Sequence, residues 1–385
     1  MVPIARWLVH EGRLVPTPRE FIEQLMNRVQ AAGIPLWRMY IGLQLIHPQL
    51  QAMGYMWRRG QPVEAVARAY GIQFTPAYIG SPMQEVREQG RKVRYRLNEL
   101  SDRHHHVLHE LKDAGGTDYY ALPMLIRRDG PPPVVTFATD LPSGFSDQDI
   151  ADLDRLVDLM GAVVEMHIER SVAETVANTY LGPVVGDRVL HGAMRRGEGE
   201  QINAVLWFSD LRDFTGMNER MSAADLLELL NNYLQLVGDA LKAHGGEILK
   251  FIGDGVMAYF PAEDALFLPI VTSSAVGAAR RLMDDIEAAN EARATGGHDP
   301  VRFGVGLHVG PVTFGNVGTE DRLDFTVIGP AVNRAARLES LTKELGVPVL
   351  ASAEFNEVCT VPMKSLGKHV LRGIPQPVEV FTLSE

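Results

Sequence analysis

The chain has 385 residues, which is enough for two or three domains that each bury a core of their own. Its net charge of −11 argues against broad binding of nucleic acid or of anionic membranes. No apolar run approaches the roughly 18 residues needed to span a bilayer. The single cysteine, Cys359, excludes an intramolecular disulfide and suits a reducing compartment. The first residues also lack a signal-peptide layout, and we therefore expect a cytoplasmic protein.

The first region, residues 1–148, alternates segments with helical and strand-like patterns. Within it, residues 119–126 and 134–139 favour a β-hairpin, which Phe145-Ser146-Asp147 and a long helix follow. This order of elements, from Tyr119 to Glu165, resembles the end of a GAF-type sensor domain. The resemblance implies an α/β regulatory domain that binds a small-molecule effector. A small α+β dimerisation domain without a ligand is the alternative.

The second region, residues 149–200, begins as a long amphipathic helix and continues as a linker. Ser146-Asp147-Gln148-Asp149 is typical of a helix N-terminus. Apolar residues then recur at helical spacing, at Ile150, Leu153, Leu156, Val157, Met160, Val163, Val164 and Ile168. The pattern predicts a helix to about Val176 and a linker over residues 178–183. Such a helix suits pairing with a second copy and passing a signal onward; a single core helix of the first domain is the alternative.

The third region, residues 201–385, alternates strands and helices in the manner of an α+β domain with βαββαβ order. Its apolar run Ala204–Phe208 predicts a buried strand that ends near Asp210, and the run Glu247–Ile252 predicts another that turns at Gly253-Asp254-Gly255. Two neighbouring strand ends would place both carboxylates together, as Mg²⁺ requires. A two-metal site for displacement at phosphorus follows as a hypothesis. Ordinary turn chemistry is the alternative for either aspartate alone.

Two further side chains suggest how a nucleotide base is read. Lys250 lies inside an otherwise apolar strand, where a charge needs a partner. Adenine presents a ring-nitrogen acceptor beside an amino donor, which suits the Lys250 ammonium together with the Thr326 hydroxyl. Guanine presents the opposite pattern and would favour a glutamate at position 250. The pair therefore favours ATP over GTP.

Residues 324–339 have the pattern of a strand, a Gly-Pro turn and a helix. Asn333 and Arg337 lie four residues apart and would share one face of that helix. Asparagine offers a donor and an acceptor, and the arginine fork suits phosphate. A solvated helix face is the alternative for this pair.

These segments, together with residues 304–310 and 314–318, resemble the catalytic domain of class III adenylate and guanylate cyclases. The resemblance lies in their order, their spacing and their flanking residues. The resemblance covers close to half of the chain. It implies a ferredoxin-like core that works as a head-to-tail homodimer, with active sites at the subunit interface. It also implies two Mg²⁺ or Mn²⁺ ions in each site.

The resemblance further implies a role for each matched residue. One subunit would supply the metal ligands, and the other would supply the groups that hold the nucleotide. The metal ligands would be Asp210 and Asp254, and the residues that bind the adenine base would be Lys250 and Thr326. Asn333 would orient the ribose, and Arg337 would stabilise the transition state. Arg372 stands where the family usually has a triphosphate-binding lysine.

The implied activity is conversion of ATP to 3′,5′-cyclic AMP and pyrophosphate by in-line attack of the ribose 3′-hydroxyl, regulated by the N-terminal domain. A nucleotide-binding regulatory protein without turnover and a guanylate cyclase are the alternatives. A palm-domain enzyme that makes cyclic dinucleotides is disfavoured, because its Gly-Gly-Asp/Glu-Glu-Phe signature is missing from the sequence.

One residue departs from the family pattern. Asp213 occupies a position where the family commonly has glycine. Its carboxylate would either repel the substrate phosphates or point outward and pair with Arg212.

Overall fold

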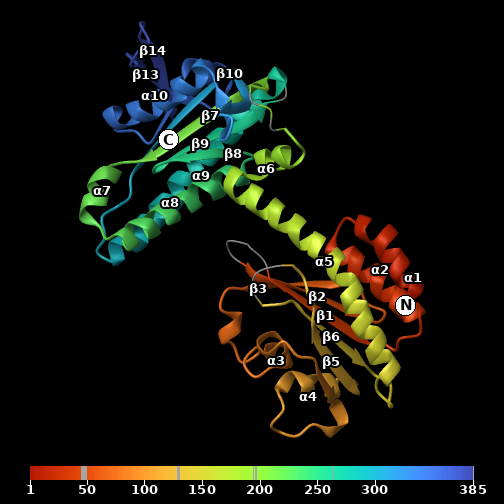
Figure 1. The fold of residues 1–385 in the computed structure, drawn as a ribbon. Coiled ribbons are helices and arrows are strands. Elements are labelled where there is room, and N and C mark those ends of the chain that lie inside the picture. Colours follow the sequence, from red (N-terminus) through yellow and green to blue (C-terminus); the bar gives the residue numbers. More distant parts are fainter. Residues whose placement is uncertain (45–49, 128–130, 194, 196, 263, 385) are drawn as a thin grey trace. The chain divides into compact units, whose positions relative to one another are not determined.

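The computed structural model describes residues 1–385 except 45–49, 128–130, 194, 196, 263 and 385 (Figure 1). Contacts between residues divide the chain into two compact units, Met1–Thr179 and Tyr180–Glu385. Over the described ranges, no helix is long and apolar enough to cross a membrane. The predicted domain boundaries, 148/149 and 200/201, stay predictions.

The N-terminal unit is built on a six-stranded antiparallel sheet with the strand order β3-β2-β1-β6-β5-β4. Its strands are β1 Arg38–Gln44, β2 Leu50–Arg58, β3 Glu64–Ala69, β4 Val93–Arg96, β5 Asp118–Pro123 and β6 Val134–Thr139. Its helices are α1 Val2–His10, α2 Pro18–Ala31, α3 Pro82–Gln89, α4 His106–Asp113 and α5 Asp147–Leu181. The predicted hairpin corresponds to β5 and β6.

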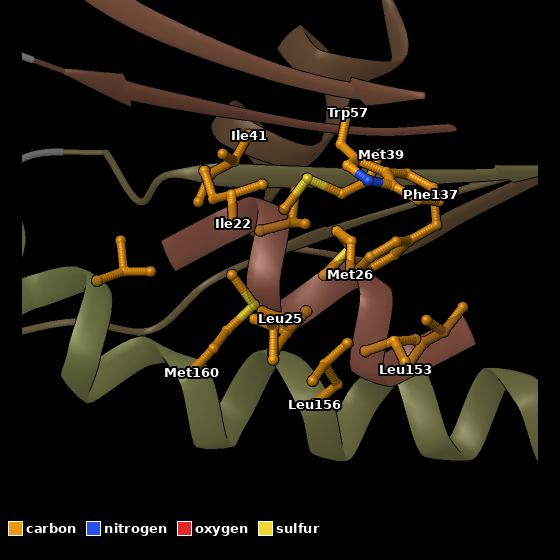
Figure 2. Close-up of a cluster of buried hydrophobic side chains, with 14 of the residues drawn as sticks. Ile22, Leu25, Met26, Met39, Ile41, Trp57, Phe137, Leu153, Leu156 and Met160 are labelled. Carbon is orange, nitrogen blue, oxygen red and sulfur yellow. The ribbon is translucent and has the colours of Figure 1, made fainter. Parts of the chain in front are cut away.

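The two faces of this sheet differ in what covers them, because side chains alternate along each strand. Met39 and Ile41 of β1 point into an apolar core with Phe137 of β6, and this core also contains residues of α2 and α5. Figure 2 shows the α2 residues Leu25 and Met26 between the sheet and α5. Both are fully buried, and each stabilises the fold by about 1.5–3 kcal/mol. The opposite face carries the alternate residues of β1.

Helix α5 begins where the sequence predicts. The Ser146 hydroxyl accepts the Asp149 amide at 3.2 Å, and the Asp149 carboxylate accepts the Ser146 amide at 2.8 Å, as in a capping box. The helix continues to Leu181, so the predicted linker over 178–183 was wrong at its start. Gly161 lies within the helix without ending it, and the helix stops at Gly182, which has a φ of 81° and precedes Pro183. Residues 153–168 pack into the core of the N-terminal unit, and pairing of this helix with a second copy stays a prediction.

The C-terminal unit has the predicted βαββαβ order. The elements β7, α8, β8, β9, α9 and β10 follow one another, and the four strands lie in the order β10-β7-β9-β8 with antiparallel neighbours. The strands are β7 Gly199–Leu211, β8 Glu247–Ile252, β9 Gly255–Ala262, β10 Phe303–Gly318, β11 Leu323–Ile328, β12 Val349–Ser352, β13 Met363–His369 and β14 Val378–Leu383. The helices are α6 Pro183–Leu190, α7 Phe214–Arg220, α8 Ala223–Ala243, α9 Leu268–Thr295, α10 Pro330–Leu345 and α11 Ala353–Val358.

Glycines on β10 determine how closely α10 approaches the sheet. A Cβ atom on Gly306 would lie 3.0 Å from the Cα of Glu339, and one on Gly310 would lie 3.1 Å from the Cβ of Ala331. Any larger residue would therefore push α10 off the sheet. This close packing fixes the position of α10, the helix that carries Asn333 and Arg337.

Candidate active site

The structure brings Asp210 and Asp254 together. Asp210 lies near the end of β7, and Asp254 lies in the turn between β8 and β9. Because Ser209 pairs with Val256 across the two strands, this turn reaches the end of β7. A Cβ on Gly255 would lie 3.3 Å from Oδ1 of Asp210, so the Asp210 carboxylate lies against the turn. The sequence prediction that these strand ends lie side by side is confirmed.

The Asp210 carboxylate is held in an environment that disfavours its charge. Burial, and then the neighbouring Asp254 carboxylate, raise the pKa of Asp210 to about 8, and Glu339 contributes in the same direction. Oδ1 of Asp210 is buried and has no hydrogen-bond partner among the described residues. Ionising a buried carboxyl beside a second carboxylate is costly. A cation between Asp210 and Asp254 would relieve both effects.

These two residues fit a hard divalent cation. Carboxylate oxygens are the ligands that Mg²⁺ prefers, and one or two of them suffice when substrate phosphates complete the coordination. In the part of the chain that the structure describes, no group of three or more His, Cys, Asp or Glu could hold a metal ion by itself. The pair therefore suits a metal that arrives with a phosphate ligand.

Sequence reasoning missed two groups beside this pair. Glu339 of α10 is half-buried, and burial raises its pKa; its backbone packs against Gly306, as described above. The Tyr233 hydroxyl of α8 is buried beside Ser209, and burial raises its pKa as well. The Gly-x-Gly pattern at 304–306 was the available signal for Glu339, because it marks where a helix closes on the strand. Tyr233 had no comparable signal in the sequence.

Lys250 and Thr326 lie on neighbouring parts of the C-terminal unit, and a third residue links them. The Lys250 ammonium forms an ion pair with the carboxylate of Asp324. Asp324 and Thr326 are two residues apart on β11 and therefore share one face of that strand. Thr326 is half-buried and pairs with Gly315 of β10. The apolar strand around Lys250 indicated that the lysine needs a partner, but it did not identify Asp324.

Asn333 and Arg337 lie one turn apart on α10, as predicted. Asn333 is exposed, and Arg337 is half-buried. Neither side chain forms a hydrogen bond or ion pair with the described residues. A Cβ on Gly373 would lie 3.4 Å from Nη2 of Arg337, so this guanidinium lies against the backbone next to Arg372. Arg372 itself is exposed.

Within the described chain, neither Asp210 nor Asp254 forms an ion pair with Lys250, Arg337 or Arg372, and Lys250 pairs with Asp324 instead. The charged groups that perturb the Asp210 carboxyl are Asp254 and Glu339, both of them acidic. None of the cations Lys250, Arg337 and Arg372 is among them. Within the described residues, the aspartate pair therefore lacks a positive partner.

Asp213 points away from the aspartate pair. It has a φ of 63°, the one positive φ at a non-glycine residue in the described ranges, and it precedes α7. Its carboxylate accepts from Arg220 at 2.8 Å, which lowers the pKa of Asp213. Arg212 instead donates to the carbonyls of Phe303 at 2.9 Å and Val347 at 2.7 Å. The expected outward orientation is confirmed, but the expected partner, Arg212, was wrong because those carbonyls already hold its guanidinium.

Comparison with known proteins gives relatives for the C-terminal unit. An adenylate cyclase of Anabaena cylindrica is 39% identical over 158 residues, covering 40% of this chain and 30% of that protein. Adenylate cyclase 1 of Rhizobium meliloti is 32% identical over 195 residues, covering 50% of this chain and 28% of that protein. The chain thus spans less than a third of the length of these curated relatives.

A solved structure covers the same region. The adenylyl cyclase CyaB from P. aeruginosa is 29% identical, with a TM-score of 0.44, and the match covers 49% of this chain and 96% of that chain. The family model described as "Adenylate and Guanylate cyclase catalytic domain" matches residues 198–385. Residues 198–385 therefore match the catalytic domain of the adenylate and guanylate cyclase family.

Proposed function

We propose that the protein is an adenylate cyclase that converts ATP to 3′,5′-cyclic AMP and pyrophosphate. The observation that carries this proposal is the pair Asp210 and Asp254, two adjacent carboxylates with no cation beside them in the described chain. A stable fold gains nothing from such a pair. A site that binds a metal–triphosphate complex requires it.

Asp210 and Asp254 would hold Mg²⁺ or Mn²⁺, two ions in each site. When bound, these ions would supply Lewis-acid neutralisation of the phosphate charge. The protein's own groups would position the nucleotide: the Lys250 ammonium would donate to the adenine ring nitrogen, and the Thr326 hydroxyl would accept from the adenine amino group. Asn333 would orient the ribose so that its 3′-hydroxyl faces the α-phosphorus in line.

Positive charge for the transition state would come from Arg337, with Arg372 binding the triphosphate. Donors that are already in place where negative charge develops give the largest catalytic effect. Arg337 is half-buried and has no protein partner among the described residues, so its guanidinium is available to a phosphate.

The active site would be shared between two copies of the chain. One subunit would supply Asp210 and Asp254, and the other would supply the nucleotide-binding groups. The absence of ion pairs between the two sets among the described residues supports this arrangement. A symmetric homodimer would then have two complete sites.

One observation favours a guanylate cyclase as the second candidate. The Asp324 carboxylate, at the Lys250 ammonium, is an acceptor on the face of β11 that Thr326 shares. Guanine presents N–H donors on the corresponding edge, and such donors seek a carboxylate. Lys250 neutralises Asp324 in the ion pair, and for this reason we place ATP first.

We further propose that the N-terminal unit is a GAF-like regulatory domain that responds to a small-molecule effector. Its six-stranded antiparallel sheet has helices on both faces and encloses a cavity, and this supports the proposal. Helix α5 would relay the signal. Removal of residues before about Tyr180 should then change activity or its dependence on dimerisation; unaltered behaviour would dismiss the relay.

The decisive experiment is an assay of the purified full-length protein with ATP and GTP in parallel, each with Mg²⁺ or Mn²⁺. Production of cyclic AMP in excess of cyclic GMP supports the proposal. Cyclic GMP in excess supports the second candidate. Nucleotide binding without either product would establish a regulatory protein without turnover and overturn the enzymatic proposal.

Mixing two inactive variants tests the shared site. Asp210→Asn removes a group of one set, and Arg337→Ala removes a group of the other. A mixed dimer would regain one intact site, so an equal mixture should recover roughly a quarter of the wild-type activity. No recovery, with mixed dimers demonstrated by differently tagged subunits, would contradict a site shared in this way.

A further inference from the structure

The N-terminal unit contains a cavity of about 480 Å³ on the face of its sheet opposite the apolar core. Its walls come from β1, β2 and β3 and from the helices α3 and α4. Cavities of this size are typical of small-molecule sites.

Glycines make room above the strands of the cavity floor. Gly42 of β1 lies directly opposite Gly54 of β2. A Cβ on Gly54 would collide with the ring of Tyr40, and one on Gly42 would lie 3.1 Å from the terminal methyl of Met83 in α3. The missing side chain of Gly54 therefore makes room for the Tyr40 ring, and that of Gly42 leaves space beside Met83 at the cavity.

Arginines line the cavity from three sides. Arg38 and Arg58 are directly opposite each other in the register of β1 and β2, where like charges destabilise a sheet. Arg68 comes from β3, and Arg87 comes from α3. Glu110 is the one acidic residue among the lining residues that the structure describes. Four arginines and a single carboxylate thus line the cavity.

Most of this positive charge has no partner in the described part of the unit. Arg58 has Glu64 at 3.7 Å, whereas Arg38, Arg68 and Arg87 form no ion pair with described residues. Nε of Arg87 is buried without a hydrogen-bond partner among them. Burial, the largest cause, lowers the pKa of Arg38, and the neighbouring Arg58 contributes in the same direction. These groups are arranged at a cost to the fold, and an anion would remove that cost.

The lining also indicates what else the ligand carries. Oε1 of Gln73 is buried at the cavity and has no hydrogen-bond partner among the described residues. This atom can only accept, so it requires an N–H or O–H from the ligand. A guanidinium fork matches a carboxylate or a phosphate in two-point contact.

From this lining we propose that the N-terminal unit binds a small organic anion, multiply charged through carboxylate or phosphate groups and bearing a hydroxyl or amino donor. Arg38 and Arg87 bind the anionic groups, and Gln73 accepts from the donor. The inference does not depend on the proposed cyclase activity, because it concerns binding to the other unit of the chain.

Isothermal titration of the full-length protein with citrate and with inorganic phosphate tests this inference, against sodium chloride at equal ionic strength and against neutral glycerol. Arg38→Gln and Arg87→Gln should each weaken anion binding at least tenfold. The matched control is Arg155→Gln, which changes an exposed arginine of α5 that pairs with Asp152 outside the cavity. Its affinity should equal that of the wild type.

The two probes distinguish the sources of the anionic group. Heat with citrate alone indicates a carboxylate ligand, and heat with phosphate alone indicates a phosphate ligand; either supports the inference. Absence of heat with both probes, or equal affinity in all three variants, overturns it.

A stability measurement separates binding from a structural role. Without ligand, Arg38→Gln removes a charge that opposes Arg58, so the N-terminal unit should unfold at the same urea concentration as the wild type or at a higher one. A lower midpoint for both Arg38→Gln and Arg87→Gln would make these arginines structural and overturn the inference.

Discussion

The two units leave charge of opposite sign without partners. In the C-terminal unit, Asp210 and Asp254 share a buried site with no cation beside them, and in the N-terminal unit, arginines line a cavity with one carboxylate. Asp118 of β5 is different: it is completely buried, but Arg94 at 2.7 Å, Arg96 at 3.1 Å and a backbone amide surround it. A buried charge with all its partners is satisfied within the fold, and the fold loses stability when one partner is removed. One without them indicates a ligand from outside the chain.

The largest effect should come from breaking the aspartate pair. Asp210→Asn should lower turnover at least a thousand-fold, equivalent to about 4 kcal/mol, because the metal–triphosphate complex loses a ligand. The same change should leave the unfolding free energy of the C-terminal unit equal or higher, because burial and Asp254 raise the pKa of Asp210 to about 8 and asparagine removes the cost of burying this carboxyl. Activity assays and urea unfolding measure the two quantities.

The matched control is Asp213→Asn, three residues along, where the carboxylate is exposed and already has Arg220. It should keep wild-type turnover. If Asp210→Asn lowered stability as much as activity, the pair would be structural and the comparison between the units would fail.

Removing Asp118 from its cluster with Arg94 and Arg96 should have the reverse outcome, a loss of stability. Asp118→Ala leaves Arg94 and Arg96 without their shared anion and the Phe145 amide without its acceptor. We expect a loss of about 3 kcal/mol in the stability of the N-terminal unit. Hydrogen exchange of peptides from β4 and β5 would measure it. Exchange as slow as in the wild type would show that the unit does not need Asp118. The presence of all its partners would then not identify a charge that the fold depends on.

Acid should weaken the C-terminal unit through His308. This residue is buried against the Ser352 hydroxyl at 2.7 Å, and burial lowers its pKa to about 4. Glu354, which pairs with Arg334, lies 3.9 Å away and only partly opposes this shift. The unfolded chain takes up the proton first, near pH 6.5, so stability is lost as the pH falls from 6.5 toward 4.

The loss should reach about 2 kcal/mol at pH 5. Urea unfolding of the C-terminal unit at pH 7 and pH 5, followed through Trp207, would measure it. In His308→Gln the difference between the two pH values should shrink by this amount; an unchanged difference would assign the acid sensitivity to other groups.

The sequence predicted those parts of the site that depend on local pattern. Apolar runs and a Gly-Asp-Gly turn located Asp210 and Asp254 at strand ends, and a four-residue spacing placed Asn333 and Arg337 on one helical face. The βαββαβ order followed from the same patterns. These features depend on periods of two and of 3.6 residues, which a sequence displays directly.

The missed features depend on contacts between residues far apart in the sequence. Asp324 meets Lys250 because β11 folds back on β10, and Glu339 meets the strand because glycines let α10 approach it. The arginine cavity was missed for the same reason: Arg38 and Arg87 belong to a strand and a helix that only the fold brings together. A count of charges along the chain cannot show which of them lack partners.

A smaller effect is expected at Lys250. Its charge has one partner in the chain, Asp324, and would gain a second in the nucleotide. Asp324→Asn removes the competing carboxylate and should shift the preference further toward ATP. In that background, Lys250→Glu should shift it toward GTP by about tenfold, because glutamate accepts from guanine. The ratio of kcat/KM for the two nucleotides measures both shifts. An unchanged ratio in the double variant would remove Lys250 from base reading.

The smallest effect should come from Asp213→Gly. Glycine adopts the left-handed conformation without strain, which compensates for loss of an exposed ion pair with Arg220. Because the carboxylate points toward Arg220 and not toward Asp210, the KM for ATP should stay within about twofold of the wild type. A KM for ATP that is lower than the wild-type value by tenfold or more would mean that Asp213 repels the substrate phosphates. Asp213 would then count among the charges that act on a ligand from outside the chain, although Arg220 already pairs with it.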